Sequence, residues 1–438
     1  MDAAAGQYPS AGCKDIDFFD EAADGVSFID GGVARPLGVR VSSLHAGFRK
    51  NSSKGDMALV VVPEGSVAAG TFTRNRFCAA PVQVSRSRAA SGHARAVVLN
   101  SGIANAATGP EGLDNARCSA DLVAGELGCD PEEVLVASTG VIGMQLDMDM
   151  YAAAVPGLVA GLGPGDGSDD GGGMAAAQAI MTTDTVPKQA ACEFTAVQPD
   201  GTEVTYHVGG MAKGAGMIAP DMATMLSVIT TDCMVEPAAA REALKLAVDA
   251  SFNRVTVDSD TSTNDSVFLL ATGGVEGRTL TSACPVFPLF VGALESVCVS
   301  LARQMAADGE GATKLVTVEV TGAASDEDAY IAAKAVADSP LVKTAIAGHD
   351  ANWGRLAGAL GKSGAVFSQE DVSIRLMGIE VMRGGLPVEF SEEEALRRFE
   401  QNDDILVEAD LGQGGGSSRI WTCDLTHGYI SINADYRS

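Results

Sequence analysis

One glycine-rich segment holds residues that could do chemistry, together with the strand that would position them. Residues 209–232 read GGMAKGAGMIAPDMATMLSVITTD, with Lys213 among the glycines and Thr224 at the start of an apolar, β-branched run. Glycine lets the backbone approach another group closely, and a short apolar run of this composition predicts a buried strand over residues 224–231. The segment therefore predicts a hydroxyl at the beginning of a core strand, with a lysine in the turn before it.

The residues alone leave two other interpretations of this segment open. Residues 214–219 satisfy the loose dinucleotide-binding pattern G-x-G-x-x-A, but only twelve residues separate Ala219 from Asp232. That span is too short for the helix and second strand that such a unit needs before its ribose-binding acid. A glycine turn that leads into an ordinary core strand explains the composition by itself.

Three further segments combine polar side chains with turn residues. Residues 138–140 read Ser-Thr-Gly after an apolar run, and we expect a strand that ends there in a loop whose backbone N–H could point at a ligand, as in an oxyanion hole. Thr182 opens the segment TTDTVPK, and Glu310 follows a helical apolar stripe over residues 290–305. Read alone, the threonines are common turn residues, and a lone glutamate at a helix end is usually solvated.

The glycine-rich segment resembles the signature of a known enzyme family. The stretch from Lys213 to Asp232, KGAGMIAPDMATML followed by SVITTD, is similar to that of the ornithine acetyltransferase (glutamate N-acetyltransferase) family of arginine biosynthesis. Weaker similarity extends over about residues 30–438, including GHDANWGR at 348–355. The resemblance implies an acetyltransferase that moves acetyl from N2-acetyl-L-ornithine to L-glutamate through an acetyl-threonine intermediate.

The resemblance also implies roles for individual residues. Similar enzymes cut themselves at the bond that corresponds to Ala223–Thr224, and the freed threonine becomes the nucleophile. A threonine hydroxyl is a weak nucleophile by itself, and the freed α-amino group of the same residue can act as its general base. The oxyanion hole is assigned to Thr139 and Gly140. Substrate contacts are implied for six residues: Thr182, Lys213, Thr224, Glu310, Asn433 and Ser438.

The implied architecture is α/β, with layered sheets sandwiched with helices, similar to but distinct from the N-terminal-nucleophile hydrolases, plus a smaller C-terminal α/β lobe. Cleavage would give an alpha chain of residues 1–223 and a beta chain of residues 224–438, with the lobe beginning at about residue 314. The two chains would stay associated as an alpha2beta2 heterotetramer. The partners would be the small-molecule substrates, with no cofactor and no metal, and with acetyl-CoA as an optional co-substrate.

Two alternatives to the transferase stay open at this stage. A self-processing aminopeptidase or amidohydrolase of similar fold would pass its acyl group to water. A non-enzymatic ligand-binding protein would keep Thr224 inside an uncut chain. Profiling of acyl donors and products with purified protein separates the three.

The order of apolar runs and helical stripes favours a layered α/β fold independently of the resemblance. Strands are expected over residues 57–62 and 95–100, followed by a helix over 112–128. Residues 157–173 read GLVAGLGPGDGSDDGGG, which cannot bury much apolar surface, so we expect an exposed, mobile loop. The Thr-Asn-Asp residues at 263–265 lack the glycine of a calcium loop and are expected to be polar scaffolding near the active site.

Composition limits the remaining function classes. The 438 residues include 30 basic and 57 acidic ones, a net charge of −27, which disfavours binding to nucleic acid or to anionic membranes. No uninterrupted apolar stretch approaches the roughly 18 residues of a membrane span and the start lacks a signal-peptide pattern, so we expect a cytoplasmic protein. Nine scattered cysteines without a C-x-x-C pair, and five histidines without a cluster, predict reduced core cysteines and no metal site.

Overall fold

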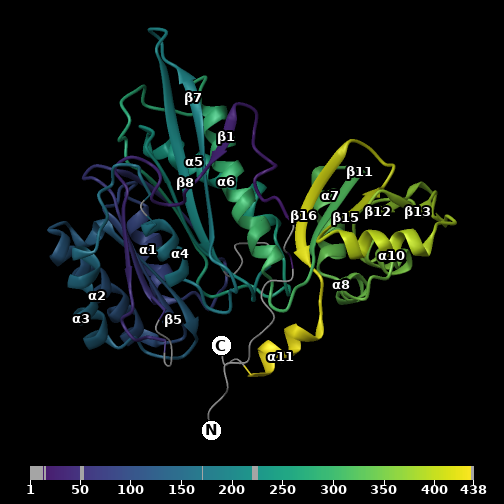
Figure 1. Cartoon of the computed structure of the whole chain (residues 1–438), viewed down its shortest axis with the longest axis horizontal. Helices are drawn as coiled ribbons and strands as arrows, with labels where there is room; N and C mark the ends of the chain where they lie inside the picture. The colour runs from purple at the N-terminus through teal and green to yellow at the C-terminus, as the bar shows by residue number, and fades with distance from the viewer. Residues whose placement is uncertain (1–12, 14–15, 50–53, 170, 220–224, 436–438) are drawn as a thin grey trace. The chain divides into compact units, whose positions relative to one another are not determined.

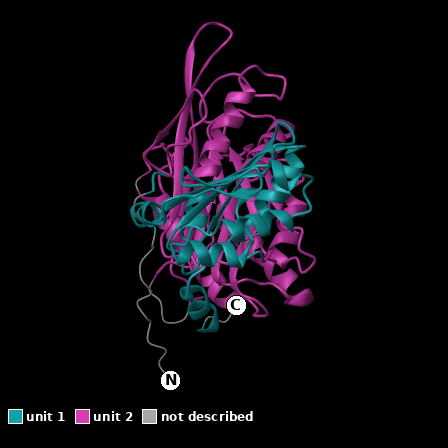
Figure 2. Cartoon of the chain, turned by 90° about the vertical axis from the view of Figure 1, so that its right-hand side faces the viewer, with its two compact units in different colours: residues 1–17, 254–259, 303–437 teal, residues 18–253, 260–302, 438 magenta. Residues whose placement is uncertain are grey.

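The chain forms two compact units, each with its own sheets and core. The computed structural model describes residues 13, 16–49, 54–169, 171–219 and 225–435 (Figure 1). Unit 1 comprises residues 1–17, 254–259 and 303–437, and unit 2 comprises residues 18–253, 260–302 and 438 (Figure 2). Both units combine sheets with helices, so the predicted α/β class is confirmed.

Unit 2 contains two sheets whose inner faces share one core. In that core, Val97 and Leu99 of the smaller sheet join Leu226 and Val228 of the larger one. The larger sheet has the order β1 (Val26–Ile29), β7 (Lys188–Val197), β8 (Glu203–Lys213), β9 (Leu226–Thr231), β10 (Ser266–Ala271), β4 (Val67–Phe72). The smaller sheet has the order β2 (Arg40–Leu44), β3 (Met57–Val61), β5 (Ala96–Ile103), β6 (Val134–Val141).

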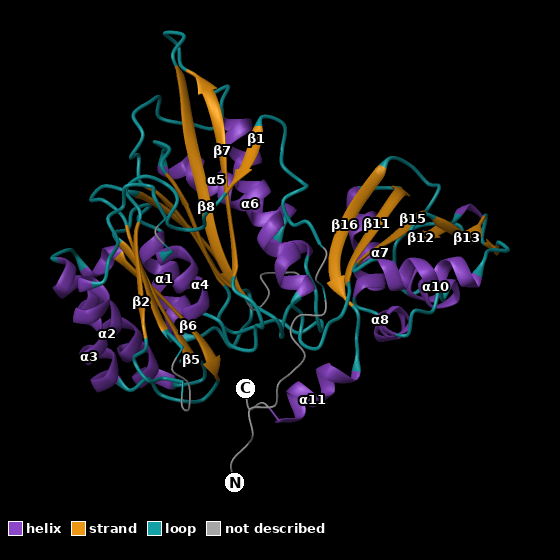
Figure 3. Ribbon diagram, viewed as in Figure 1, coloured by secondary structure: helices purple, strands orange, loops and turns teal. Residues whose placement is uncertain are grey.

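Helices cover the outer faces of these sheets, which makes unit 2 a layered sandwich (Figure 3). Leu59 and Val98 point from the smaller sheet into a second core that it forms with its covering helices α1 (Ala80–Ala89), α2 (Gly109–Leu127) and α3 (Met148–Ala160). On the larger sheet, Gly210 of β8 lies against Val297 and Leu301 of α6 (Phe287–Ala307). Helix α5 (Pro237–Ala250) contacts β4, and α4 (Gly172–Ala179) contributes to the shared core. The layered sheets sandwiched with helices are thus confirmed.

Unit 1 is the smaller C-terminal α/β lobe that the sequence predicts. The described residues of this unit form one sheet, with the order β14 (Leu386–Pro387), β13 (Ile379–Arg383), β12 (Ser373–Leu376), β15 (Asp404–Asp410), β11 (Leu315–Ala323), β16 (Gly416–Cys423). Its helices are α7 (Asp326–Ala337), α8 (Pro340–Ala347), α9 (Trp353–Gly361), α10 (Glu392–Gln401) and α11 (His427–Asp435). Alternate apolar residues of β11, including Val316 and Val318, pack against α7 and α9 in one core.

Local sequence signals account for where several helices begin and end. Pro237 starts α5, because its fixed φ suits the first helical turn and its missing N–H costs nothing there. Ser325 caps α7 by accepting from the N–H of Asp328. Helix α6 is the one helix among the described residues that is long and apolar enough to cross a membrane, and 78% of that apolar window is buried. It is therefore a core helix of the fold.

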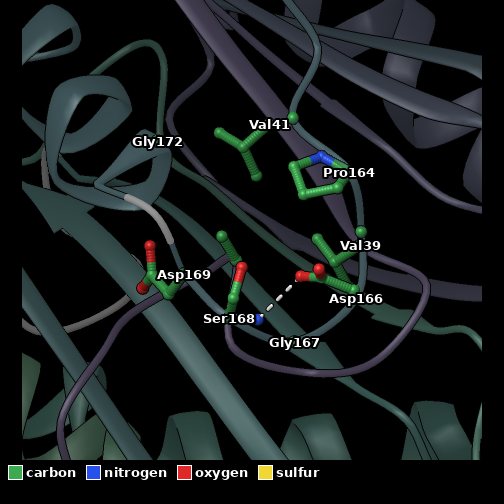
Figure 4. A pocket seen from close by; sticks show the side chains of 11 residues that line it. Val39, Val41, Pro164, Asp166, Gly167, Ser168, Asp169 and Gly172 are labelled. Atoms are coloured by element: carbon green, nitrogen blue, oxygen red, sulfur yellow. Dashed lines mark hydrogen bonds between the residues drawn. The ribbon is translucent and has the colours of Figure 1, made fainter.

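The glycine- and aspartate-rich stretch is only partly the loop that its composition predicts. Helix α3 continues to Ala160 and α4 begins at Gly172. Between them, Asp169 accepts from the N–H groups of Gly32 and Gly173 at 2.8 and 3.3 Å, which ties the loop to the sandwich. Figure 4 shows the small cavity beside this loop, about 10 Å³, or room for a single water. Such a cavity is too small for a substrate.

The expectation of core cysteines holds for five of the nine. All nine are free, and the buried ones are Cys192, Cys233, Cys284, Cys298 and Cys423. Burial raises the pKa of the Cys192 thiol to about 12, so this side chain behaves as a small apolar group. Cys118 is exposed on α2, where the core prediction is wrong.

Candidate active site

The antiparallel pair of β8 and β9 places the glycine-rich segment at one end of the larger sheet. Strand β8 ends at Lys213 and β9 begins at Leu226, and these two residues are register partners. The strand predicted from its β-branched run is confirmed from Leu226 onward, and every residue of it is buried. Ala223 and Thr224, the predicted cleavage site and nucleophile, lie outside the described residues. Met225 is the described residue that follows them.

Lys213 brings together two threonine hydroxyls from distant parts of the chain. Its side chain is 3% exposed, and its Nζ donates to Thr182 Oγ1 at 2.7 Å and to Thr139 Oγ1 at 3.3 Å. An ammonium group has no acceptor, so each threonine must give its own hydroxyl proton to some other acceptor. The cluster can therefore present two O–H donors beside a positive charge.

Asp184 is the carboxylate of this cluster, and sequence analysis did not single it out. It accepts from Lys188 Nζ at 2.7 Å, and its other oxygen lies 3.8 Å from Lys213 Nζ. It also accepts from the backbone N–H groups of Thr182 and Gly214, at 2.9 and 2.7 Å. One carboxylate thus fixes both segments that contribute to the cluster. The available signal was the acid and lysine four positions apart in TTDTVPK.

The charge of Asp184 is set by its two lysines. Burial alone would raise the pKa of this carboxyl, but the charges of Lys188 and Lys213 hold it well below its usual range. Hydrogen bonds from Lys188 and from the Thr182 N–H act in the same direction. The carboxyl is therefore ionised at neutral pH. Two ammonium groups and one carboxylate give these three side chains a net positive charge, which suits a ligand carboxylate.

The pairing of β6 with β5 explains why position 140 is glycine. Gly140 is the register partner of Gly102 and has a φ of 131°. A Cβ at Gly140 would lie 2.3 Å from the carbonyl carbon of Gly102, so no other residue fits. The loop expected at residues 138–140 is wrong, because β6 continues through Thr139 and Gly140 to Val141. A second glycine on the neighbouring strand lets the ladder continue.

Asn264, two residues before β10, is hydrogen-bonded to the backbone beside Thr139. Its Nδ2 donates to the carbonyl oxygens of Ala104 and Ser138, at 2.6 and 2.8 Å. Ser138 directly precedes Thr139, so the side chain of Asn264 fixes the backbone next to the threonine. The polar scaffolding expected at residues 263–265 therefore has a defined contact with the cluster.

The neighbouring residue, Asp265, contacts Met225, the residue that follows the expected nucleophile. Its Oδ1 accepts from the N–H of Met225 at 2.9 Å, while its Oδ2 is buried without a hydrogen-bond partner among the described residues. Burial raises the pKa of Asp265 well above its usual value, although the Met225 N–H and the charge of Lys213 act against this. The site thus contains a charged carboxylate, Asp184, and a carboxyl whose surroundings favour the neutral form.

Two predicted substrate contacts meet within unit 1. Asn433 of α11 donates its Nδ2 to Glu310 Oε2 at 2.7 Å. Glu310 is only 8% exposed, so it is not the solvated glutamate that a position just after a helix usually gives. An ionised carboxylate here could accept from a substrate ammonium. Ser438, the remaining predicted contact, lies outside the described residues.

The predicted residues therefore gather in two places: Thr139, Thr182 and Lys213 in unit 2, and Glu310 and Asn433 in unit 1. Wherever the chain is described, no group of three or more His, Cys, Asp or Glu side chains is arranged to hold a metal ion.

Sequence comparisons with known proteins give consistent matches over nearly the whole chain. A sequence model of the ArgJ family matches residues 40–438. The chain is 48% identical over 410 residues to the "Arginine biosynthesis bifunctional protein ArgJ" of Nitratidesulfovibrio vulgaris, covering 92% of this chain and 100% of that protein. It is 42% identical over 416 residues to the protein of the same name from Bacillus subtilis, covering 95% and 98%. An ornithine acetyltransferase from Mycobacterium tuberculosis, solved in complex with ornithine, shares 42% identity over 44% of this chain and 98% of that chain, with a TM-score of 0.39.

Proposed function

Because this chain belongs to the ArgJ family, we propose that it transfers acetyl from N2-acetyl-L-ornithine to L-glutamate in arginine biosynthesis. The main structural support for this proposal is the buried contact of Lys213 with the hydroxyls of Thr139 and Thr182. Lys213 is the register partner of Leu226, the first residue of β9, which follows the expected nucleophile by two positions. We propose the cytoplasm as the place of this reaction.

Thr224 is the proposed nucleophile, freed when the chain cuts its own Ala223–Thr224 bond. Its Oγ attacks the acetyl carbonyl and its proton passes to the freed α-amino group, which returns it to the ornithine amine as the C–N bond breaks. The glutamate amine then attacks the acetyl-threonine ester. The ester C–O bond breaks, and Oγ regains a proton as N-acetylglutamate leaves. The bond from Met225 N–H to Asp265, at 2.9 Å, supports a fixed position for the residue after this nucleophile.

Thr139 and Gly140 are the proposed oxyanion hole. Lys213 donates to Thr139 Oγ1 at 3.3 Å, so the threonine proton is directed to another acceptor, and the acetyl oxyanion would be that acceptor. The close packing of Gly140 against the backbone of Gly102 supports a fixed position for the Gly140 N–H, which would be the second donor of the hole.

The remaining predicted contacts are proposed to hold the two substrates. Lys213 and Thr182 can donate to a substrate carboxylate, as can the amide of Asn433 and the hydroxyl of Ser438. Glu310 can accept from a substrate ammonium, because it is a buried carboxylate already oriented by its bond to Asn433. Lys213 would also favour the neutral form of a nearby amine, since a like charge lowers the pKa of an amino group.

The two pieces of the cut chain are proposed to stay associated as an alpha2beta2 heterotetramer. Acetyl-CoA is proposed as an optional second acetyl donor. Native mass spectrometry gives the stoichiometry, and transfer from acetyl-CoA to glutamate in the absence of acetylornithine tests the second donor. The hydrolase alternative is not favoured, since both the family and its named relatives concern arginine biosynthesis.

The product of the second half-reaction tests transfer against hydrolysis. We expect ping-pong kinetics with acetylornithine and glutamate, and little free acetate when glutamate is saturating, because positioning of the acceptor amine can supply roughly 7 to 11 kcal/mol of the barrier. Lys213→Met should reduce transfer more than Glu310→Gln, since it removes a buried cation that contacts Thr139 and Thr182. Free acetate and N-acetylglutamate are measured in the same reactions. Acetate as the main product at saturating glutamate would assign the chain to the hydrolases instead.

Asp184→Asn is expected to lower kcat/KM for transfer by about 10², because displacement of a positioning group by an ångström can cost that much. The variant keeps the side-chain volume but removes the charge that holds Lys188 and Lys213. Steady-state kinetics with both substrates measures the effect.

Asp56→Asn is the matched control for this prediction. Asp56 is also fully buried and accepts from backbone N–H groups, namely those of Ala46, Gly47 and Arg49. Both variants should lose stability. Only in Asp184→Asn should the loss of turnover be larger than the unfolded fraction of the protein explains. Equal kcat/KM values for the two folded variants would show that Asp184 has no positioning role.

A further inference from the structure

One cavity of unit 2 has a charge opposite to that of the chain as a whole. It measures about 520 Å³ and is lined by residues of β4, α1 and α5 and of the segments that follow β4 and α5. Its charged lining residues are Arg74, Arg86, Arg241, Lys245 and Asp249. Basic residues thus outnumber acidic ones by four to one here, whereas the chain has 30 basic and 57 acidic residues. We call this site the cationic cavity.

A second cavity of unit 2, also lined by residues of α1, has a similar size but a balanced charge. It measures about 510 Å³ and is lined by two arginines, Arg88 and Arg117, and two acids, Asp121 and Glu132. Arg88 lies 3.4 Å from Glu132, and Arg117 lies 3.2 Å from Asp114, which is outside the lining, so both arginines have an acidic partner. A balanced wall of this kind needs no ligand. In the cationic cavity, the single acid, Asp249, is already the ion-pair partner of Lys245.

Contacts with the protein fix one basic side chain of the cationic cavity, that of Arg86. Arg86 donates to the carbonyl oxygen of Thr73 at 2.8 Å, and its guanidinium carbon lies 5.6 Å from the centre of the Phe72 ring. Arg241 and Lys245 are four residues apart on α5, so they share one face of the helix. Both side chains can therefore donate to the same bound anion.

We propose that the cationic cavity binds a compact polyanion, a small molecule with two or more phosphate or carboxylate groups. Arginine side chains suit such groups because their planar N–H donors can bind two oxygens at once. The volume falls within the roughly 300 to 1,000 Å³ of small-molecule sites. Phe72 and Val248 add apolar wall, and the Asn253 amide adds a polar group. The proposal does not depend on the acetyl transfer proposed above.

Calorimetric titration of the purified whole enzyme with pyrophosphate and with citrate tests this proposal. At low salt, at least one of the two anions should bind saturably, and added salt should weaken it because screening shortens the reach of the charges. Arg241→Glu should weaken binding by about tenfold or more, since it replaces an attraction with a repulsion. Arg241 is exposed on α5, so the substitution leaves the core unchanged.

Arg278→Glu is the control, because it makes the same charge change at another exposed position of unit 2 outside the cavity. Because this variant changes the net charge of the protein but not the cavity, it should change the affinity for the anion by less than about twofold. Binding of pyrophosphate alone would identify a phosphate site, and binding of citrate alone a carboxylate site. No saturable binding of either anion up to roughly 10 mM, or equal losses in the two variants, would overturn the proposal.

Discussion

Replacement of Thr224 by alanine is expected to leave one intact chain of 438 residues that transfers no acetyl group. The two losses share one cause, because the hydroxyl that attacks and the amine that takes its proton belong to the same residue. Removal of a covalent nucleophile typically costs roughly 10⁶ in kcat. Denaturing mass spectrometry measures the cleavage, and the formation of N-acetylglutamate measures the transfer.

The wild-type enzyme and Thr224→Ser are the references for this experiment. The wild type should give two pieces, residues 1–223 and residues 224–438, the second with 438 − 223 = 215 residues. Serine keeps both the hydroxyl and the future amine, so Thr224→Ser should still cut itself and retain part of its activity. An intact single chain from fresh, active wild-type enzyme would rule out an N-terminal threonine as the nucleophile.

The individual strands of this site could be predicted from the sequence because their signal is local. The β-branched run before Asp232 predicts β9, and the apolar run before Asn100 predicts β5, whatever the rest of the chain does. The glycines before β9 also marked a place where backbone and side chains crowd together. Only resemblance to a family, however, gave Thr224 and Lys213 their expected roles.

The partners of Lys213 could not be predicted, because they depend on contacts between distant segments. Thr182 and Thr139 precede it by 31 and 74 positions, and only the folded arrangement of β8, β6 and the segment between α4 and β7 brings them to its Nζ. Asp184 was missed for a related reason. An acid three residues before a turn proline usually faces solvent, and the burial of Asp184 between two lysines is a property of the folded sandwich.

One incorrect loop prediction and one that is only partly correct have specific physical causes. At residues 138–140, turn-forming residue types suggested that a strand ends, but Gly102 on the neighbouring strand leaves room for Gly140 and the ladder continues. In the glycine- and aspartate-rich stretch, Asp169 accepts hydrogen bonds from two backbone N–H groups, which a count of apolar residues does not detect. In both cases, a partner distant in sequence satisfied backbone that looked unsupported.

Thr139→Ala is expected to lower kcat by roughly 10² to 10³, or about 3 to 4 kcal/mol, the usual cost of one oxyanion donor. The reason lies in the direction of the Thr139 hydroxyl. Lys213 can only donate to it, so its own proton must go to another acceptor, and the proposed acceptor bears negative charge only as the reaction proceeds. Substrate binding should therefore change little, and KM should stay near the wild-type value.

Thr139→Ser separates this catalytic loss from a structural one. Serine retains an O–H donor within reach of Lys213 and should recover most of kcat, whereas alanine also leaves a buried ammonium with one acceptor fewer, at a cost in stability of about 1 to 3 kcal/mol. Thermal denaturation of both variants measures that cost independently of turnover. If Thr139→Ala turned over at the wild-type rate, the oxyanion assignment would be wrong. If alanine and serine lost kcat equally, the methyl group of the threonine, and not its proton, would be the group that matters.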